Sequence, residues 1–181
     1  MTSSGDAAPA EARGADADGV IERDGDRWSV RFVRFLDTDI DTAWRLMSEP
    51  EQLARWFEPA LLDRDGGYHF DGDEGLHSFG KILYCAPPTS YSVTWTAPGD
   101  EDSPSTSITV TVAERDGGGV ELTLEHRGLG AVDVADYGAG WHAYLDRLVT
   151  SGSVLAPLES DWSDRFADRR PRYLRMVDPT G

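Results

Sequence analysis

A hairpin pattern between residues 106 and 127 constrains the fold more than any other feature of the sequence. Apolar and polar residues alternate in TSITVTVAE and again in VELTLEHRG, and the turn sequence RDGGG separates the two segments. Strict alternation predicts strands with one buried face, and a glycine-rich turn between them predicts an antiparallel hairpin. GGYHF, LHSFGKILYC and SYSVTWTA read as further strands. We therefore expect residues 61–127 to form an antiparallel sheet with one dry face.

Helical periods flank this run of strands. RWSVRFVRFL at 27–36 alternates like a strand, and apolar residues then recur at helical spacing over 40–47. Pro50 suits the first turn of a second short helix. Apolar residues recur every three or four positions over 133–156, which predicts a long amphipathic helix, and a short helix is expected over 160–169.

This order of elements predicts an α+β fold in which a curved antiparallel sheet wraps around the long C-terminal helix, with two short helices after the first strand. Three parts are expected along the 181 residues. Residues 1–25 are acidic and poor in branched apolar residues, and such a composition predicts a disordered tail. Residues 26–157 form the domain, and 158–181 form an extension packed on it by a short helix.

The charge balance restricts the partners. Seventeen basic residues stand against 33 acidic ones, a formal net charge of −16. This surplus disfavours nucleic acids and repels anionic lipid surfaces. We expect no membrane span, because no apolar run reaches 18 residues, and a cytoplasmic location, because the first residues do not resemble a secretory signal. A protein partner remains open, as does the choice between a monomer and a homodimer.

The composition also limits the chemistry. The single cysteine, Cys85, excludes an internal disulfide, and we expect it to be an inert thiol in a buried strand. The glycine-rich loops typical of nucleotide sites are absent, and we predict no cofactor. Five candidate metal ligands lie close together, but glycines interrupt them, which favours a solvated acidic turn over a metal site; they are His69, Asp71, Asp73, Glu74 and His77.

Several segments resemble a known family. They are RFLDTDIDTAWRLMSEPEQLARWFEP, GKILYCAPPTSYSVTW, the hairpin SITVTVAERDGGGVELTLEHRGL, and GWHAYLDRL. In order and spacing they resemble the heat-shock-protein-90 ATPase activator-like family. That family belongs to the START-like, or SRPBCC, superfamily, which is also called the helix-grip, polyketide cyclase and lipid-transport group. The resemblance spans about residues 27–155 and implies the helix-grip fold.

The resemblance also implies a hydrophobic cavity between the sheet and the long helix. The residues expected to bind a ligand there are Trp56, Phe70, Tyr84, Trp95, His126, Trp141 and Tyr144. Each of the aromatic side chains could instead simply fill the core. His126 is the only catalytic candidate, and its alternative role is a hydrogen-bonded tie between sheet and helix. Arg34 is expected to form a structural ion pair, and His142 to point toward the rim or the solvent.

These features leave three functions open. The preferred one is the binding of a small hydrophobic or amphipathic ligand, because no acid–base pair or metal set is evident. The second is an enzyme of the cyclase or dehydratase type that uses His126 in the same cavity. The third is a co-chaperone-like interaction protein, which the name of the family suggests.

Overall fold

The computed structural model describes residues 17–70, 78–99, 103–150 and 162–178. The strands are β1 Val20–Asp24, β2 Arg27–Leu36, β3 Ala60–Leu62, β4 Gly67–Phe70, β5 Phe79–Ala86, β6 Ser90–Trp95, β7 Thr106–Glu114 and β8 Val120–Leu129. The helices are α1 Ile40–Ser48, α2 Pro50–Leu53, α3 Ala131–Thr150 and α4 Trp162–Val177.

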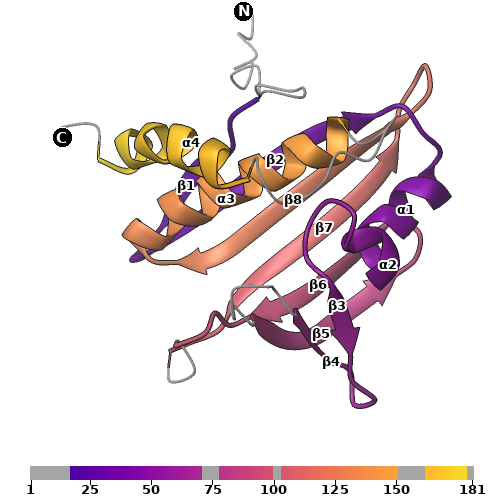
Figure 1. The fold of residues 1–181 in the computed structure, drawn as a ribbon, viewed down its shortest axis with the longest axis horizontal. Helices are drawn as coiled ribbons and strands as arrows, with labels where there is room; N and C mark the ends of the chain where they lie inside the picture. The colour runs from indigo at the N-terminus through magenta and orange to yellow at the C-terminus, as the bar shows by residue number, and fades with distance from the viewer. Residues whose placement is uncertain (1–16, 71–77, 100–102, 151–161, 179–181) are drawn as a thin grey trace, which may run out of the picture.

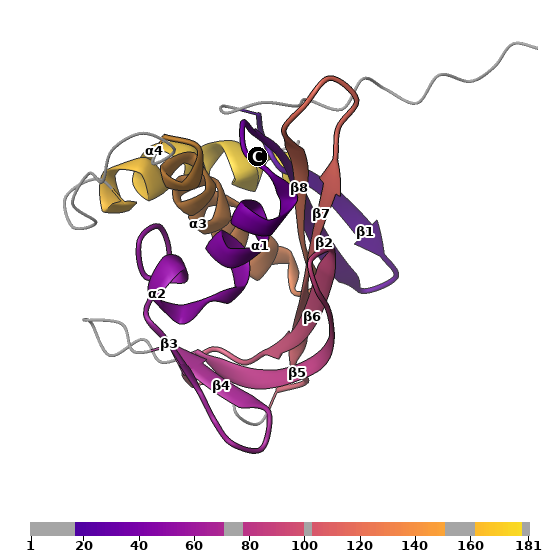
Figure 2. The ribbon, with the colours of Figure 1, turned by 90° about the vertical axis from the view of Figure 1, so that its right-hand side faces the viewer.

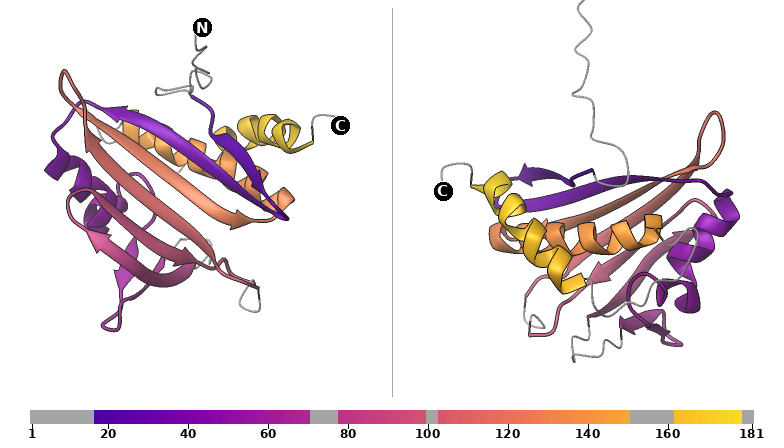
Figure 3. Two further views of the ribbon diagram at one scale, coloured as in Figure 1. Left: turned by 180° about the vertical axis from the view of Figure 1, so that it is seen from behind. Right: turned by 45° about the horizontal axis from the view of Figure 1, so that its top comes forward.

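The strands form one curved sheet in the order β1-β2-β8-β7-β6-β5-β4-β3, and every neighbouring pair is antiparallel. The sheet curves around α3, and the described helices all lie on its concave side (Figures 1 and 2; Figure 3, left). The predicted α+β helix-grip fold is therefore confirmed, including the two short helices that follow β2.

The predicted hairpin is the β7–β8 pair. Its register places Val110 opposite Leu124 and Val112 opposite Leu122, so that the apolar faces of both strands coincide. These side chains are almost fully buried in one core. The sequence pattern succeeds here because a shift of one residue would turn every apolar side chain to the wet face.

The predicted disordered tail over 1–25 is wrong at its C-terminal end. Residues 20–24 form β1, which pairs with β2, while residues 1–16 lie outside the described part of the chain. Gly25 has a φ of 63° in the tight turn between the two strands, a conformation that glycine adopts without strain. Ile21 packs against the core, which gives this acidic strand an apolar anchor.

The last helix is longer than the expected short helix over 160–169. It extends to Val177 and contains Pro171. It lies against α3 (Figure 3, right). The burial of Tyr173 and the packing of Leu174 and Val177 against the core carry the helix past the proline, which removes one backbone donor.

Gly138 permits the close contact between α3 and α4. A Cβ atom at this position would lie 2.6 Å from the ring of the buried Tyr173, whereas at Gly140 the nearest atom, on Trp162, would be 3.7 Å away. Alanine favours a helix over glycine by about 1 kcal/mol, but overpacking a core costs about 1–3 kcal/mol. We therefore expect Gly138→Ala to destabilise the protein and Gly140→Ala to stabilise it in urea denaturation. Equal shifts for the two variants would contradict this packing.

Candidate functional site

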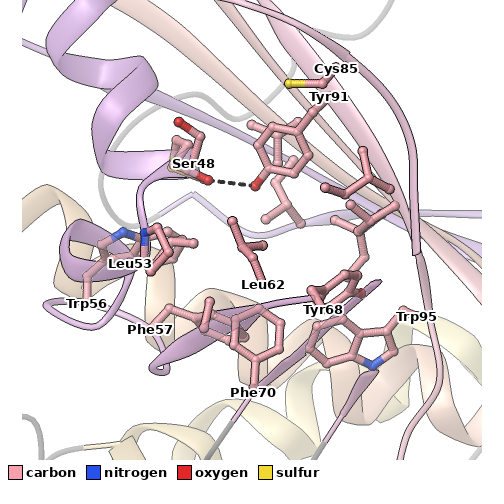
Figure 4. A pocket seen from close by; sticks show the side chains of 18 of the residues that line it. Ser48, Leu53, Trp56, Phe57, Leu62, Tyr68, Phe70, Cys85, Tyr91 and Trp95 are labelled. Carbon is pink, nitrogen blue, oxygen red and sulfur yellow. Dashed lines mark hydrogen bonds between the residues drawn. The ribbon is translucent and has the colours of Figure 1, made fainter. Parts of the chain in front are cut away.

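A cavity of about 240 Å³ lies among α1, α2, α3 and the strands β3 to β8. Figure 4 shows its walls: Leu53 and Phe57 lie on one side, and Tyr68, Tyr91 and Trp95 lie on the sheet side. The exposed side chains of Leu62 and Ile82 also line the cavity, so it reaches the surface beside β3 and β5. The lining is almost entirely apolar.

Four of the seven residues expected to bind a ligand line this cavity. They are Trp56, Phe70, Trp95 and Trp141. They come from the turn after α2, from β4, from β6 and from α3, so the fold brings together residues that are up to 85 positions apart in the sequence. Tyr84, His126 and Tyr144 are not among the lining residues, and their positions correct the sequence-based expectation.

Phe57 lies at the centre of the aromatic wall, although it was not among the expected ligand-binding residues. Its ring stacks on Trp141 at 5.1 Å between centroids. It also meets Phe70 edge-on at 5.0 Å and Tyr144 at 4.6 Å. The sequence places Phe57 on the same side of the short helix as Trp56, but does not show that both side chains reach the cavity.

The polar atoms of the aromatic walls bond within the protein. Trp56 Nε1 donates to the carbonyl oxygen of Leu46 at 2.8 Å, and Trp95 Nε1 donates to the Tyr137 hydroxyl at 2.9 Å.

The two tyrosines of the sheet wall behave in the same way. Tyr91 donates its hydroxyl hydrogen to the carbonyl oxygen of Met47 at 2.8 Å (dashed in Figure 4), and Tyr68 donates to that of Thr94. Burial raises the pKa of both tyrosines above the ordinary value, so both hydroxyls stay protonated. The walls therefore offer a ligand mainly apolar surface.

His126 lies behind the cavity wall and is fully buried. Its Nδ1 accepts a hydrogen bond from Trp141 Nε1 at 3.1 Å, which assigns the ring proton to Nε2. Nε2 lies 2.7 Å from the Thr106 hydroxyl, which in turn donates to the carbonyl oxygen of Trp95 at 3.1 Å. Burial lowers the pKa of His126 to about 3. Both ring nitrogens of His126 therefore form hydrogen bonds within the protein, and the side chain links the sheet to α3.

Tyr144 lies beside the aromatic wall and braces it from α3. Its hydroxyl donates to Glu58 Oε1 at 2.6 Å, and its ring packs on Phe57 and Trp162. Burial and the hydrogen bond to Glu58 raise its pKa, which keeps the hydroxyl protonated. This hydroxyl is engaged with the carboxylate of Glu58, so Tyr144 supports the wall rather than lining it.

A bulge in β5 explains why Tyr84 does not line the cavity. The pairing with β6 shifts between Ile82 and Tyr84, which leaves Leu83 without a partner position. Alternation resumes one residue out of phase, so Cys85 lines the cavity together with Ile82, while Tyr84 is exposed and does not line it. The expectation of a buried Cys85 was wrong, because β5 is exposed along almost its whole length and Cys85 is exposed with it.

A buried ion cluster fastens α4 to α3 and to β2. It comprises Arg34, His142, Asp146, Arg165 and Arg169. Arg34 and Asp146 expose only 1% and 5% of their side chains and lie 3.8 Å apart, so the expected ion pair of Arg34 is present.

His142 was expected at the rim or in solvent but is buried, because α4 covers it. Its Nδ1 lies 3.0 Å from the Tyr173 hydroxyl. The pKa of His142 is lowered to about 3. Burial is the main cause, and the positive charges of Arg169 and Arg34 add to it.

The candidate metal ligands lie mostly outside the described residues. Of the five, only His69 is described, and its Nδ1 lies 3.7 Å from Asp63 Oδ1. The described ranges contain no group of three or more histidine, cysteine or acidic side chains that could hold a metal ion. None of the described helices is long and apolar enough to cross a bilayer.

Comparison with known proteins agrees with this geometry. Residues 37–151 match the family described as "Activator of Hsp90 ATPase homolog 1-like protein". No curated protein matches the chain.

Three solved structures illustrate the shared fold. CalU16 from Micromonospora echinospora superposes with a TM-score of 0.71 at 23% identity, over 89% of this chain and 98% of that chain. EF2215 from Enterococcus faecalis, a conserved protein of unknown function, superposes with a TM-score of 0.67 at 17% identity, over 90% of this chain and 92% of that chain. DynU16, a putative protein in the dynemicin biosynthetic locus, superposes with a TM-score of 0.64 at 20% identity, over 74% of this chain and 50% of that chain.

Proposed function

This chain belongs to the Activator of Hsp90 ATPase homolog 1-like family, and from that premise we propose that it binds a small apolar or amphipathic molecule in the cavity between its sheet and its helices. The observation that carries the proposal is the apolar, aromatic lining of the cavity. Aromatic rings surround a space of about 240 Å³, and their N–H and O–H groups are bonded to the protein.

The chemistry of this wall selects the ligand. A polar group placed deep in the cavity would lose its hydration and gain few partners, at a cost of about 1–3 kcal/mol. An aromatic or aliphatic group gains about 25 cal/mol per Å² of apolar surface that leaves water. Because Leu62 and Ile82 are exposed at the mouth, a polar end of the ligand can remain in solvent. The favoured ligand is apolar at its inner end.

Filling the cavity from within tests this proposal. Val93 lines the cavity and lies opposite Ile82 on β5 and Ile108 on β7. Val93→Phe is expected to weaken the binding of 1-naphthol at least tenfold without lowering the melting temperature, because the new ring occupies the ligand's space. Isothermal titration calorimetry measures the affinity.

Val132→Phe is the matched control, because Val132 is 63% exposed on the first turn of α3 and does not line the cavity. It should leave the affinity unchanged. Equal affinities of wild type and Val93→Phe, with both proteins folded, would place any binding elsewhere.

An enzyme of the cyclase or dehydratase type is the alternative within the same cavity. General acid–base catalysis requires a group within hydrogen-bond reach of the reacting proton. His126 does not line the cavity and is hydrogen-bonded at both ring nitrogens, which weighs against this role. Recovery of a bound ligand in unaltered form supports binding alone, whereas a chemically altered ligand identifies an enzyme.

A co-chaperone role rests on the family description alone. Stimulation of a chaperone ATPase by the purified protein would establish it, and the cavity variant Val93→Phe would show whether the two activities are linked. A cytoplasmic location is also part of the proposal. The free, exposed thiol of Cys85 fits a reducing compartment, and cell fractionation tests the location.

A further inference from the structure

The mouth of the cavity lies in an unusually apolar part of the surface. We call it the apolar corner and define it by its six large side chains, which are 40–59% exposed: Leu61, Leu62, Phe79, Ile82, Leu83 and Tyr84. They belong to β3 and β5, at the end of the molecule farthest from α4 (Figures 1 and 2). The cluster is compact, because β4 joins the two strands through direct pairing.

The corner is apolar on both faces of the sheet. Leu61 and Phe79 share one row across β4, because both pair with His69. Leu62 and Ile82 point to the other face, where they line the cavity mouth. A ligand leaving the cavity therefore passes directly onto exposed apolar surface.

The size and shape of the corner distinguish between possible occupants. If a large side chain offers about 200 Å² when fully exposed, the six expose on the order of 600 Å² in total. A stable protein interface buries about 800 Å² on each partner. A partner protein that packs on one face of the sheet would cover only part of the corner, and would leave the side chains of the other face in water. A fluid apolar phase can surround both faces of a protruding edge.

Charge selects the kind of lipid surface. The chain carries a net charge of −16, which repels anionic headgroups. Lys81, the only lysine of the chain, lies on β5 between Phe79 and Leu83. A lysine and a tyrosine among leucines suit the boundary between headgroups and acyl chains, since both have an apolar stem and a polar end.

We infer that the apolar corner docks on a zwitterionic lipid surface and that the ligand passes through the cavity mouth between this surface and the protein. This inference rests on the proposed function, because it assigns the route by which the apolar cavity is filled. The insertion is peripheral and uses side chains of β3 and β5.

Flotation with vesicles of pure phosphatidylcholine tests the inference. Wild-type protein is expected to float with the vesicles. The double variant Leu61→Gln with Leu83→Gln keeps the charge and changes two corner residues outside the cavity lining, and we expect its partition to fall at least tenfold. Val132→Gln, an exposed apolar residue outside the corner, serves as control and should bind like wild type.

Lipid charge supplies a second measurement on the wild type alone, so the test does not depend on the folding of the variant. With 20% phosphatidylserine in the vesicles, binding should weaken at low salt and recover at high salt, because salt screens the repulsion. Stronger binding to the anionic vesicles at low salt would overturn the assignment of a zwitterionic surface.

The failure of this inference is distinguishable from that of the proposed function. If wild-type protein binds 1-naphthol but does not float, the docking inference is wrong and the cavity proposal stands. If it floats but does not bind 1-naphthol or other apolar probes, the cavity proposal fails. A wild-type dimer in light scattering that the double variant converts to a monomer would assign the corner to a second copy and overturn the lipid assignment.

Discussion

Asp146→Ala is expected to lower the free energy of unfolding by about 3–5 kcal/mol, because it removes the carboxylate at the centre of the buried ion cluster. Arg34 and Arg169 both contact this carboxylate, and His142 Nε2 lies 3.6 Å from it. Without Asp146, buried positive charges face one another in a medium that screens them poorly. Urea denaturation at neutral pH measures the loss.

Asp136 provides the matched control for this variant. It pairs with Arg170 and so also joins α3 to α4, but the two side chains are 41% and 39% exposed. Exposed pairs contribute about 0–1 kcal/mol, so Asp136→Ala should have a small effect. A loss for Asp146→Ala that is no larger than that for Asp136→Ala would show that the cluster does not hold α4 in place.

Lowering the pH from 8 to 5 is expected to remove about 2 kcal/mol of stability through His126 alone. Burial lowers its pKa from 6.5 to about 3 in the folded state, so the unfolded chain binds a proton there first as the pH falls. The stabilisation is complete above the unfolded pKa near 6.5 and is lost progressively toward pH 3. His126 forms hydrogen bonds with Trp141 and Thr106 and ring contacts with Trp95 and Tyr137, and all four side chains are uncharged.

The His126→Gln variant isolates this contribution from other titrating groups. Its stability at pH 8 should be lower than that of wild type, since the amide replaces the ring bonds imperfectly. Its loss between pH 8 and pH 5 should be smaller than the wild-type loss by about 2 kcal/mol. Parallel losses in the two proteins would mean that His126 is not buried in its neutral form.

The strands and helices of this domain were predictable wherever one periodic pattern governed a whole segment. The alternation in β6, β7 and β8 and the helical spacing in α3 each direct one apolar face toward the core. The exceptions have local causes. β1 is acidic and short, and its pairing with β2 depends on the turn at Gly25. The sequence Asp24–Gly25 is the signal that could have revealed this hairpin.

The candidate site was less predictable, because the residues that form it come from separate elements. The family resemblance suggested Trp56, Phe70, Trp95 and Trp141, which line the cavity. The pattern could not reveal the bulge that exposes Tyr84, since a bulge changes the phase of alternation without a fixed sequence signal.

His142 illustrates a second limit on prediction from sequence. Helical spacing directs His142 away from Trp141, but its burial depends on α4, which docks from a distant part of the chain. Periodicity describes one element at a time, whereas burial depends on every element packed against it.

A crystal structure of the protein with 1-naphthol tests the central claim most directly. We predict electron density for the naphthyl ring within the cavity, in contact with Phe57, Trp95 and Trp141, while the hydrogen bonds of Tyr91 to Met47 and of Trp95 to Tyr137 remain in place. A cavity closed by rearranged side chains, or a ligand bound only outside it, would contradict the assignment of this cavity as the binding site.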